Sequence, residues 1–419
     1  MAAVFAAKQK KFAILGAGRL GQSTAAHFAM NGLETALWDP ETERIEAIRS
    51  KGNTIKLSGV VEGEGRLSAV SSSLQEVAES SEVLIMCAGG FAQEEFARQL
   101  CPHLKPWHHV ILFPGDTFGA LSVRQIFDVY DASYAQITVS ETSSALFTCN
   151  LVENGTCEIK AVKTNIPFAT IPASRTAEVL DCLRPYYTQF APVQSVLETS
   201  LNNMHAVANP VVALMNAARA ESGQAFRLFR EGVTPAVAAV MDRVDQERRA
   251  LCGAAGVQGV PLAAWLHEAY DLPLESLDRM YRGAGQYDDV GQGAALAFIH
   301  EDICAGLVPM ASLGQLLGVP TPTMDGLLQL ARAAFPELQE RLAAGRRVRT
   351  VRSVGLCMAQ VPGSSSASAR RERLDRYLLT GDRDDLGKEQ VLVVGSGAVA
   401  HVLAGLLAAR EDLAVSVWA

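Results

Sequence analysis

The stretch KFAILGAGRLGQSTAAHFAMNGLETALWD, residues 11–39, decides the fold. The apolar run FAIL predicts a buried strand and a glycine turn ends it. Apolar residues then recur at helical spacing, and a second apolar run ends at Asp39. A strand, a helix and a second strand of these lengths form one parallel βαβ unit. We therefore expect an α/β fold that begins with a Rossmann-like, doubly wound sheet.

Three glycines, Gly16, Gly18 and Gly21, form GAGRLG directly after the first strand and at the opening of the helix. In that context a GxGxxG sequence binds a dinucleotide. The first glycine permits the tight turn, the second lets the backbone approach the pyrophosphate, and the third lets helix and strand pack closely. Arg19 and Leu20 belong to the same candidate cofactor site. The alternative is a glycine turn that holds no ligand.

Asp39 ends the second strand, where a carboxylate accepts hydrogen bonds from the ribose hydroxyls of the adenosine half. A 2′-phosphate would meet a negative charge at this place, so the sequence favours NAD(H). Arg44 lies one helical turn further on and keeps NADP(H) as a second possibility. Asp39 can also cap the helix that DPETER begins, a role that is compatible with cofactor binding.

Composition narrows the class of protein. A net charge of −8 offers no basic surface, so we expect no nucleic-acid partner. The uncharged run Ile303–Met324 is broken by three prolines, so we expect no membrane span, and the opening MAAVFAAKQKK lacks the order of a secretory signal. Eight cysteines without CxxC pairs or nearby histidines indicate a reduced, cytoplasmic protein without a metal site.

The pattern of strands and helices divides the chain into domains. Residues 1–184 read as an NAD-binding Rossmann-like domain, with strands at Val83–Cys87 and Val110–Phe113 and a strand segment around Cys157–Ile171. Residues 185–360 read as a mainly helical substrate and catalytic domain, and residues 361–388 as a linker. Amphipathic stretches predict helices at Ala177–Phe190, Val233–Ala255 and Met324–Ala344.

Residues 389–419 repeat the layout of the opening: a strand, a GxGxxA turn at Gly395, Gly397 and Ala400, a helix and a short strand. One βαβ unit alone cannot bury both faces of its strands. We expect this partial unit to be unstable alone, to pair with something else, or to begin a further domain.

Several separated blocks carry a family resemblance. They are SETSSALFTC (140–149), LETSLNNMHAVANP (197–210), LMNAARAESG (214–223), EGVTPAV (231–237), EDICAGLVP (301–309) and VPTPTMD (319–325). In these blocks the chain resembles the octopine/nopaline (opine) dehydrogenase family, most closely the bacterial carboxyethyl-norvaline dehydrogenase type. The resemblance implies an NAD(P)-dependent enzyme that joins an amino acid to a 2-oxo acid by reducing the imine between them.

The resemblance also implies a catalytic histidine and aspartate. Asp302 matches the aspartate, whereas Asn209 stands directly before Pro210, where the family has its histidine. His205 lies one helical turn earlier, and Ala297 stands where the family has an arginine for a substrate carboxylate.

Only His205 of the two helix residues can exchange a proton near neutral pH, because an asparagine amide cannot act as an acid or base. We therefore expect Asp302 to orient and charge the imidazole of His205, and Asn209 to hold a substrate carbonyl or carboxylate. Each residue also has a structural alternative. Asn209 before Pro210 can be a helix N-cap, His205 a polar residue between helices, and Asp302 the cap of the following helix.

Thr142 and Ser143 fall in the loop between the domains and are candidates for binding the oxo-acid carboxylate, unless they are only turn residues. Arg124 is a second candidate for anion binding; the alternative is a solvated charge on a helix.

Two other functions remain open. A 3-hydroxyacid or ketopantoate-type reductase shares this architecture but relies on a lysine in the helical domain, and no lysine lies between Lys163 and Lys388. The exchange at Asn209 and the loss of arginine at Ala297 favour a catalytically degenerate dinucleotide-binding protein. A homodimer is one oligomeric state that the sequence allows.

Overall fold

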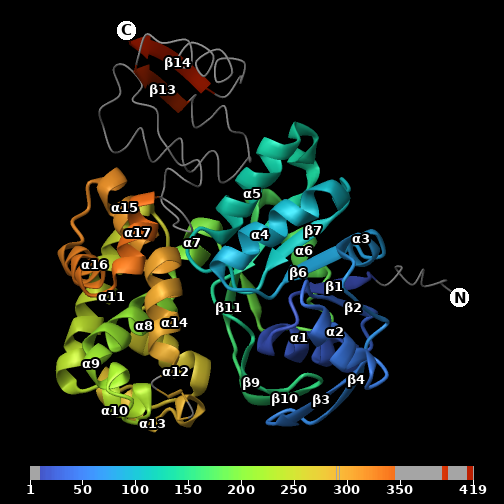
Figure 1. Cartoon of the computed structure of the whole chain (residues 1–419), viewed down its shortest axis with the longest axis horizontal. Helices are drawn as coiled ribbons and strands as arrows, with labels where there is room; N and C mark the ends of the chain where they lie inside the picture. The colour runs from blue at the N-terminus through green and yellow to red at the C-terminus, as the bar shows by residue number, and fades with distance from the viewer. Residues whose placement is uncertain (1–9, 289, 292, 345–388, 395–412, 419) are drawn as a thin grey trace, which may run out of the picture.

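The structure, a computed structural model, describes residues 10–288, 290–291, 293–344, 389–394 and 413–418. The linker expected at 361–388 and the turn at Gly395, Gly397 and Ala400 lie outside these residues. Two lobes stand side by side, with helices in one and two sheets with their covering helices in the other (Figure 1).

An eight-stranded sheet forms the centre of the first lobe, in the order β12-β11-β8-β7-β6-β1-β2-β5. The six strands from β8 to β5 run parallel, and β11 is antiparallel to β8. Its strands are β1 Phe12–Leu15, β2 Thr35–Trp38, β5 Ala69–Ser71, β6 Val83–Met86, β7 His109–Leu112, β8 Thr138–Thr142, β11 Ile166–Ile171 and β12 Phe190–Pro192. The expected strands at Val83–Cys87 and Val110–Phe113 are therefore β6 and β7. The four central strands β1, β2, β6 and β7 are buried along their whole length, as apolar runs in a covered parallel sheet should be.

A smaller sheet, which the sequence did not predict, packs against the first helix. It has the order β4-β3-β10-β9 and contacts α1. Gly65 permits the approach, because a Cβ there would lie 2.2 Å from the carbonyl oxygen of Ala26. The strands of this sheet are β3 Thr54–Gly59, β4 Gly63–Arg66, β9 Phe147–Glu153 and β10 Thr156–Val162; the helices of the lobe are α1 Arg19–Met30, α2 Thr42–Arg49, α3 Leu74–Glu79, α4 Gly90–Leu100, α5 Gly119–Tyr130 and α6 Thr176–Asp181.

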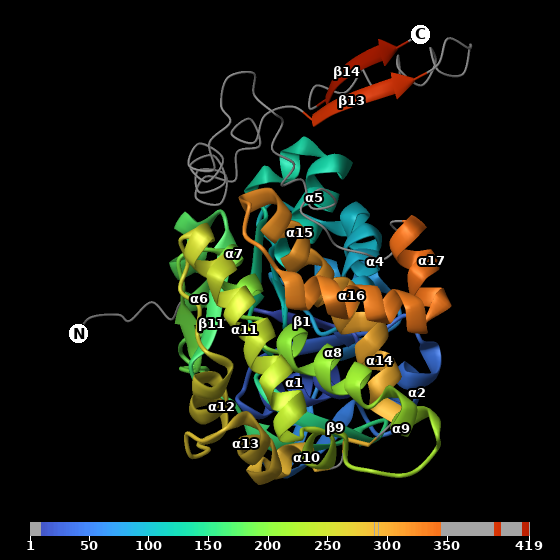
Figure 2. The same cartoon turned by 90° about the vertical axis from the view of Figure 1, so that its left-hand side faces the viewer.

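The second lobe is helical, and its helices α8 and α14 lie side by side (Figure 2). Its helices are α7 Val196–Leu201, α8 His205–Met215, α9 Ala217–Glu221, α10 Leu228–Gly232, α11 Pro235–Ala255, α12 Leu262–Tyr270, α13 Leu277–Gly283, α14 Gly293–Asp302, the π-helical turn η5 Ile303–Leu307, α15 Val308–Leu317, α16 Pro322–Ala334 and α17 Pro336–Ala344.

The helix expected at Val233–Ala255 is present as α11. The one expected at Ala177–Phe190 was too long: α6 ends at Asp181, and Phe190 begins β12, which extends the large sheet past residue 184. The stretch Met324–Ala344 is two helices, because the residue before Pro336 is disfavoured in the helical conformation. Near the end of the chain, β13 Glu389–Val394 and β14 Leu413–Trp418 pair in parallel.

One helical stretch, Gly293–Leu317, is long and apolar enough to cross a membrane by length and composition alone. Of its most apolar window, 61% is buried inside the protein, the pattern of a core helix. It runs through α14, η5 and α15, and it carries Asp302.

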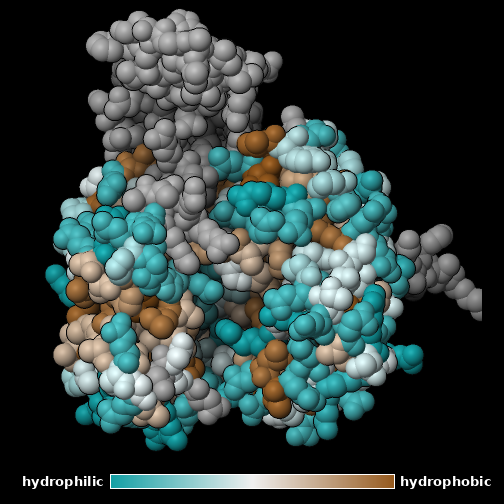
Figure 3. Space-filling view, viewed as in Figure 1, coloured by the Kyte–Doolittle hydropathy of each residue, from teal (hydrophilic) through white to brown (hydrophobic). Residues whose placement is uncertain are grey.

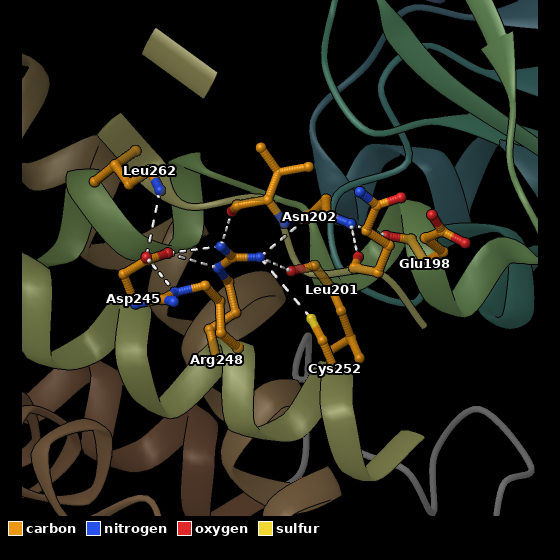
Figure 4. Close-up of polar contacts among 10 residues, drawn as sticks. Glu198, Leu201, Asn202, Asp245, Arg248, Cys252 and Leu262 are labelled. Atoms are coloured by element: carbon orange, nitrogen blue, oxygen red, sulfur yellow. Dashed lines mark hydrogen bonds and ion pairs between the residues drawn. The ribbon is translucent and has the colours of Figure 1, made fainter. Parts of the chain in front are cut away.

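A buried arginine fixes the turn between α7 and α8 (Figure 4). Arg248 of α11 is fully buried and pairs with Asp245 at 2.6 Å. It also donates to the carbonyl of Leu201 at 2.8 Å and to the side chain of Asn202 at 3.0 Å. The start of α8 is therefore held by charge-assisted hydrogen bonds from the longest helix of the lobe.

We expect Arg248→Met to lower the free energy of unfolding by about 3–5 kcal/mol, because it removes the buried partner of the Asp245 carboxylate and leaves only Arg249, an exposed residue 3.0 Å away. Arg243→Met, on the exposed face of the same helix, is the matched control and should change stability by about 0.5 kcal/mol or less. Denaturant unfolding measures both, and equal effects would contradict the role given to Arg248.

Candidate active site in the cleft between the lobes

The glycine loop has the geometry that a dinucleotide requires. Gly16 has φ +105°, and a Cβ at Gly21 would lie 1.7 Å from the carbonyl oxygen of Gly16, so both positions need glycine for the loop to close. Gly18 is different: a Cβ there would meet nothing within 4 Å. It leaves open space in front of the first turn of α1, whose N-cap has no side-chain hydrogen bond. Free backbone N–H groups at a helix start attract phosphate.

The other two loop residues stand at the same helix start. Arg19 is exposed as the first residue of α1, and Leu20 is half-buried behind it.

Asp39 connects the loop to the end of β2. Its buried carboxylate accepts hydrogen bonds from the backbone N–H of Ala17 at 2.6 Å and of Glu41 at 2.9 Å. Arg44 approaches to 3.5 Å. The N-cap of α2 is Glu41, so Asp39 supports the turn before that helix rather than capping it. These residues fit the adenosine end of a nicotinamide dinucleotide.

Between the two lobes the surface is hollowed (Figure 3). Two candidate catalytic residues, Asn209 and Asp302, are in contact on the helical lobe. The amide nitrogen of Asn209, on α8, donates to the carboxyl group of Asp302, at the end of α14, over 3.1 Å. Both structural alternatives are wrong. Asn209 and Pro210 lie inside α8, so Asn209 is no N-cap, and the Asp302 side chain caps no helix.

A proline shapes the helix beyond Asp302. Pro309 has no N–H to give to the carbonyl of Ala305, four residues before it, and the helix widens into the π-turn η5. The carbonyl of Ala305 accepts from the backbone N–H of Thr117, in the loop after β7, at 3.2 Å. The adjacent Glu301 lies against the start of α4, since a Cβ at Gly89 would be 3.4 Å from its carboxylate. Asp302 thus stands at the carboxyl ends of the parallel strands, where such sheets bind ligands.

The surroundings of Asp302 favour its protonated form. Removal from bulk water raises the pKa of its carboxyl group to about 8; the hydrogen bond from Asn209 and the charge of Arg19 oppose the rise, and the carboxylates of Asp116 and Glu301 add to it. The residue remains partly exposed. Asp302 can therefore gain or lose a proton close to neutral pH.

His205 lies one helical turn before Asn209. It is the first residue of α8, and its ring stands edge-on to Trp265 with 6.3 Å between the ring centres. Burial, followed by the positive charges of Lys163 and Arg19, lowers the pKa of the imidazole to about 3. The expected pairing of Asp302 with His205 is corrected here: Asp302 bonds to Asn209 one turn away, and His205 stays neutral.

The three expected substrate residues have different surroundings. The hydroxyl of Thr142 is buried at the end of β8 and, among the described residues, has no hydrogen-bond partner, and Ser143 follows it, also buried. Arg124 is neither solvated nor free for a substrate, which corrects both readings of it. Its guanidinium is buried and bonds to Asp128 at 2.7 Å and to the carbonyl of Ile137 at 2.9 Å.

Comparison with known proteins identifies the family. Residues 192–335 match the model of the NAD/NADP octopine/nopaline dehydrogenase α-helical domain, and residues 11–114 match the NAD-dependent glycerol-3-phosphate dehydrogenase N-terminus. The chain is 31% identical to opine dehydrogenase of Arthrobacter sp. (strain 1C), over 77% of this chain and 90% of that protein. The chain belongs to the octopine/nopaline dehydrogenase family. It is an NAD(P)-dependent dehydrogenase of the opine type, as the sequence resemblance predicts.

More distant relatives agree on the fold. D-nopaline dehydrogenase of Agrobacterium tumefaciens (strain T37) is 25% identical over 76% of this chain and 84% of its own. Octopine dehydrogenase with NADH and L-arginine superposes with a TM-score of 0.66 at 16% identity, covering 89% of this chain and 98% of that one. A ketopantoate reductase from Ralstonia eutropha JMP134 has a TM-score of 0.55 at 17% identity, covering 78% and 99%. The predicted α/β fold class is confirmed.

In this opine dehydrogenase family member, Glu141 is a residue that sequence reasoning missed. Its fully buried carboxylate accepts hydrogen bonds from the hydroxyls of Thr199 at 2.5 Å and Ser200 at 2.7 Å, and from the N–H of Ala120 at 2.8 Å. It joins β8 of the first lobe to α7 of the second. The signal was an acidic residue inside a strand otherwise free of charge. Ala297, where the resemblance led us to expect an arginine, is exposed on α14.

We expect Gly18→Ala to fold normally and to weaken NADH binding about tenfold or more, about 1.4 kcal/mol, because its methyl group enters the open space before α1. Gly21→Ala should lose both stability and binding, since its methyl group meets the Gly16 carbonyl. Gly253→Ala, on an exposed face of α11, controls for the substitution itself. Calorimetric titration with NADH measures this, and unchanged affinity in Gly18→Ala would exclude this loop as the pyrophosphate site.

Proposed function

We propose that this enzyme joins the amine of an amino acid to the carbonyl of a 2-oxo acid, with Asp302 as the group that carries the proton. The observation behind this proposal is the Asn209–Asp302 hydrogen bond in the cleft, at the carboxyl ends of the parallel strands. The family membership supplies the reaction type. The solved structures of octopine dehydrogenase with L-arginine and with pyruvate support the two substrate classes.

Asp302 is the one member of the expected catalytic group suited to proton transfer. An asparagine cannot ionise, and an imidazole whose pKa has fallen to about 3 is neutral at neutral pH and has no imidazolium proton to donate. A carboxyl group whose pKa is raised to about 8 is protonated at neutral pH and can release its proton. Asn209 then has a positioning role: its amide holds the carboxyl group of Asp302 without competing for the proton.

The proton has a defined destination in this reaction. The amine of the amino acid adds to the carbonyl carbon of the oxo acid, and Asp302 gives its proton to the hydroxyl oxygen that leaves as water. A nicotinamide cofactor held by the glycine loop supplies the hydride that reduces the resulting imine. In the reverse direction, the Asp302 carboxylate accepts the proton.

Thr142 and Ser143 remain the proposed contacts for the oxo-acid carboxylate, and the unpaired hydroxyl of Thr142 supports this role. NAD(H) is the proposed cofactor, because the Asp39 carboxylate at the end of β2 would accept hydrogen bonds from the ribose hydroxyls and would repel a 2′-phosphate. Arg44, 3.5 Å from Asp39, keeps NADP(H) as the second candidate. The described cysteines form no disulfide, which fits the cytoplasmic location that we propose.

We expect Asp302→Asn to lower kcat/KM about 10²-fold or more in NADH oxidation with pyruvate and a pool of L-amino acids, because asparagine keeps the shape but has no proton that it can give up. His205→Gln should keep most of the activity. If His205→Gln lost more activity than Asp302→Asn, His205 rather than Asp302 would be the proton donor. No turnover in the unaltered protein, with NADH still bound, would instead support a degenerate dinucleotide-binding protein.

The pH dependence should follow the carboxyl group. Since Asp302 must be protonated for imine formation and its pKa is raised to about 8, kcat/KM for the reductive direction should fall as the pH rises through about 8. The oxidative direction needs the carboxylate, so its rate should rise through the same pH. Steady-state rates in both directions measure this. A break near about 6.5, the ordinary pKa of an imidazole, would contradict the assignment.

A further inference from the structure

Lys163 lies in the loop after β10 and is almost completely buried, with 3% of its surface exposed. Its ammonium group stands over the ring of Trp265 at 5.6 Å and over the ring of Tyr270 at 5.8 Å, both on α12 of the helical lobe. Within the part of the chain that the structure describes, it makes no ion pair. A buried lysine without a counter-ion carries a large desolvation cost that two aromatic faces offset only in part.

The position of Lys163 relates it to the active site. Trp265 lies close to both Lys163 and His205. The Lys163 ammonium stands over its ring, and the ring centres of Trp265 and His205 are 6.3 Å apart. His205 begins α8, and Asn209 follows on the same helix about 6 Å further along its axis. Lys163 therefore comes from the other lobe and faces the first turn of α8, close enough for its charge to act on His205.

The substrates proposed for this enzyme each carry a carboxylate, and the cation expected for one of them is missing, because Ala297 occupies the arginine position. A carboxylate bound inside a cleft needs a cation or several N–H donors. Lys163 is a cation at this cleft that has no anionic partner in the described chain.

We propose that Lys163 binds a carboxylate of the substrate, beside His205 and Trp265, in place of the family's arginine. This inference rests on the proposed function. The neutral imidazole of His205 can add a hydrogen bond to the same carboxylate. The ligand is either the 2-oxo acid or the amino acid, which share this chemistry.

Lys163 also belongs to a loop that joins the lobes, so a structural role must be separated from a binding role. The next two residues contact α12: the hydroxyl of Thr164 donates to the carbonyl of Glu268 at 3.1 Å, and the amide of Asn165 donates to its carboxylate at 3.1 Å. If Lys163 were only part of this clamp, its loss would lower stability and leave carboxylate binding unchanged.

The test uses the NADH-loaded protein, thermal unfolding and two probes, pyruvate alone and a mixture of L-amino acids alone. At least one probe should raise the unfolding midpoint of the unaltered protein, and the probe that does so identifies the carboxylate. Lys163→Met, which keeps a long apolar side chain, should lose that rise. Lys163→Arg should retain it, and so should Lys56→Met, an exposed lysine on the neighbouring strand β3.

Turnover gives a second readout. With the active protein, Lys163→Met should raise KM for the identified substrate about 10–100-fold, the size expected for the loss of a charged hydrogen bond, and affect kcat less. The inference is overturned if neither probe stabilises the unaltered protein, or if Lys163→Met is stabilised as strongly as Lys56→Met. A stabilisation that depends on Lys163 without any turnover would preserve the carboxylate site and reject the proposed function.

Discussion

Pro309 imposes the constraint on which the active-site geometry depends. A proline cannot donate to the carbonyl four residues earlier, so the helix that carries Asp302 cannot continue as a regular α-helix through Ala305. The π-turn at Ile303–Leu307 accommodates this break, and the carbonyl of Ala305 bonds to the backbone of Thr117 in the other lobe. Because Pro309 cannot donate to the Ala305 carbonyl, this carbonyl is available for a hydrogen bond between the lobes, three residues after Asp302. Glu141 provides a second connection, through the hydroxyls of Thr199 and Ser200.

The exchange of histidine for asparagine changes the chemistry of the aspartate beside it. An imidazolium partner would stabilise the carboxylate form and lower its pKa, whereas an amide carries no charge and only partly offsets the cost of burial. Asp302 therefore has neighbouring acids and a neutral partner, and its proton is held at neutral pH. In the sequence, Asn209 in place of a histidine argues against catalysis. In the structure, the same replacement leaves the role of the acid to the carboxyl group of Asp302. Burial, and after it the positive charges of Lys163 and Arg19, lower the pKa of His205 and keep its ring neutral.

Structural features that depend on local residue spacing were predictable from the sequence. The run of strand, glycines and helix at 11–39 specified the Rossmann-like start, since close packing at Gly21 and a positive φ at Gly16 follow from the motif itself. The resemblance identified the family and pointed to Asp302. The local rule for Asn before Pro failed, because α8 begins four residues earlier and tolerates Pro210 in its interior.

The other predictions that failed concern residues whose surroundings are set by contacts between segments far apart in the sequence. Arg124 reads as a solvated helix charge until its packing against Ile137 is known, and the neutrality of His205 depends on burial beside Trp265 and on a lysine from the other lobe. The small sheet against α1 escaped notice because its strands come from two distant segments, 54–66 and 147–162. No local pattern contains this information.

The most direct test of the central claim is infrared difference spectroscopy of the NADH-bound protein across a pH titration, with Asp302→Asn as the reference. The account predicts a C=O band of a protonated carboxylic acid at neutral pH that disappears as the pH rises through about 8 and is missing from Asp302→Asn. A spectrum in which Asp302→Asn removes only carboxylate bands at neutral pH would show that Asp302 is ionised and would contradict its role as the proton donor.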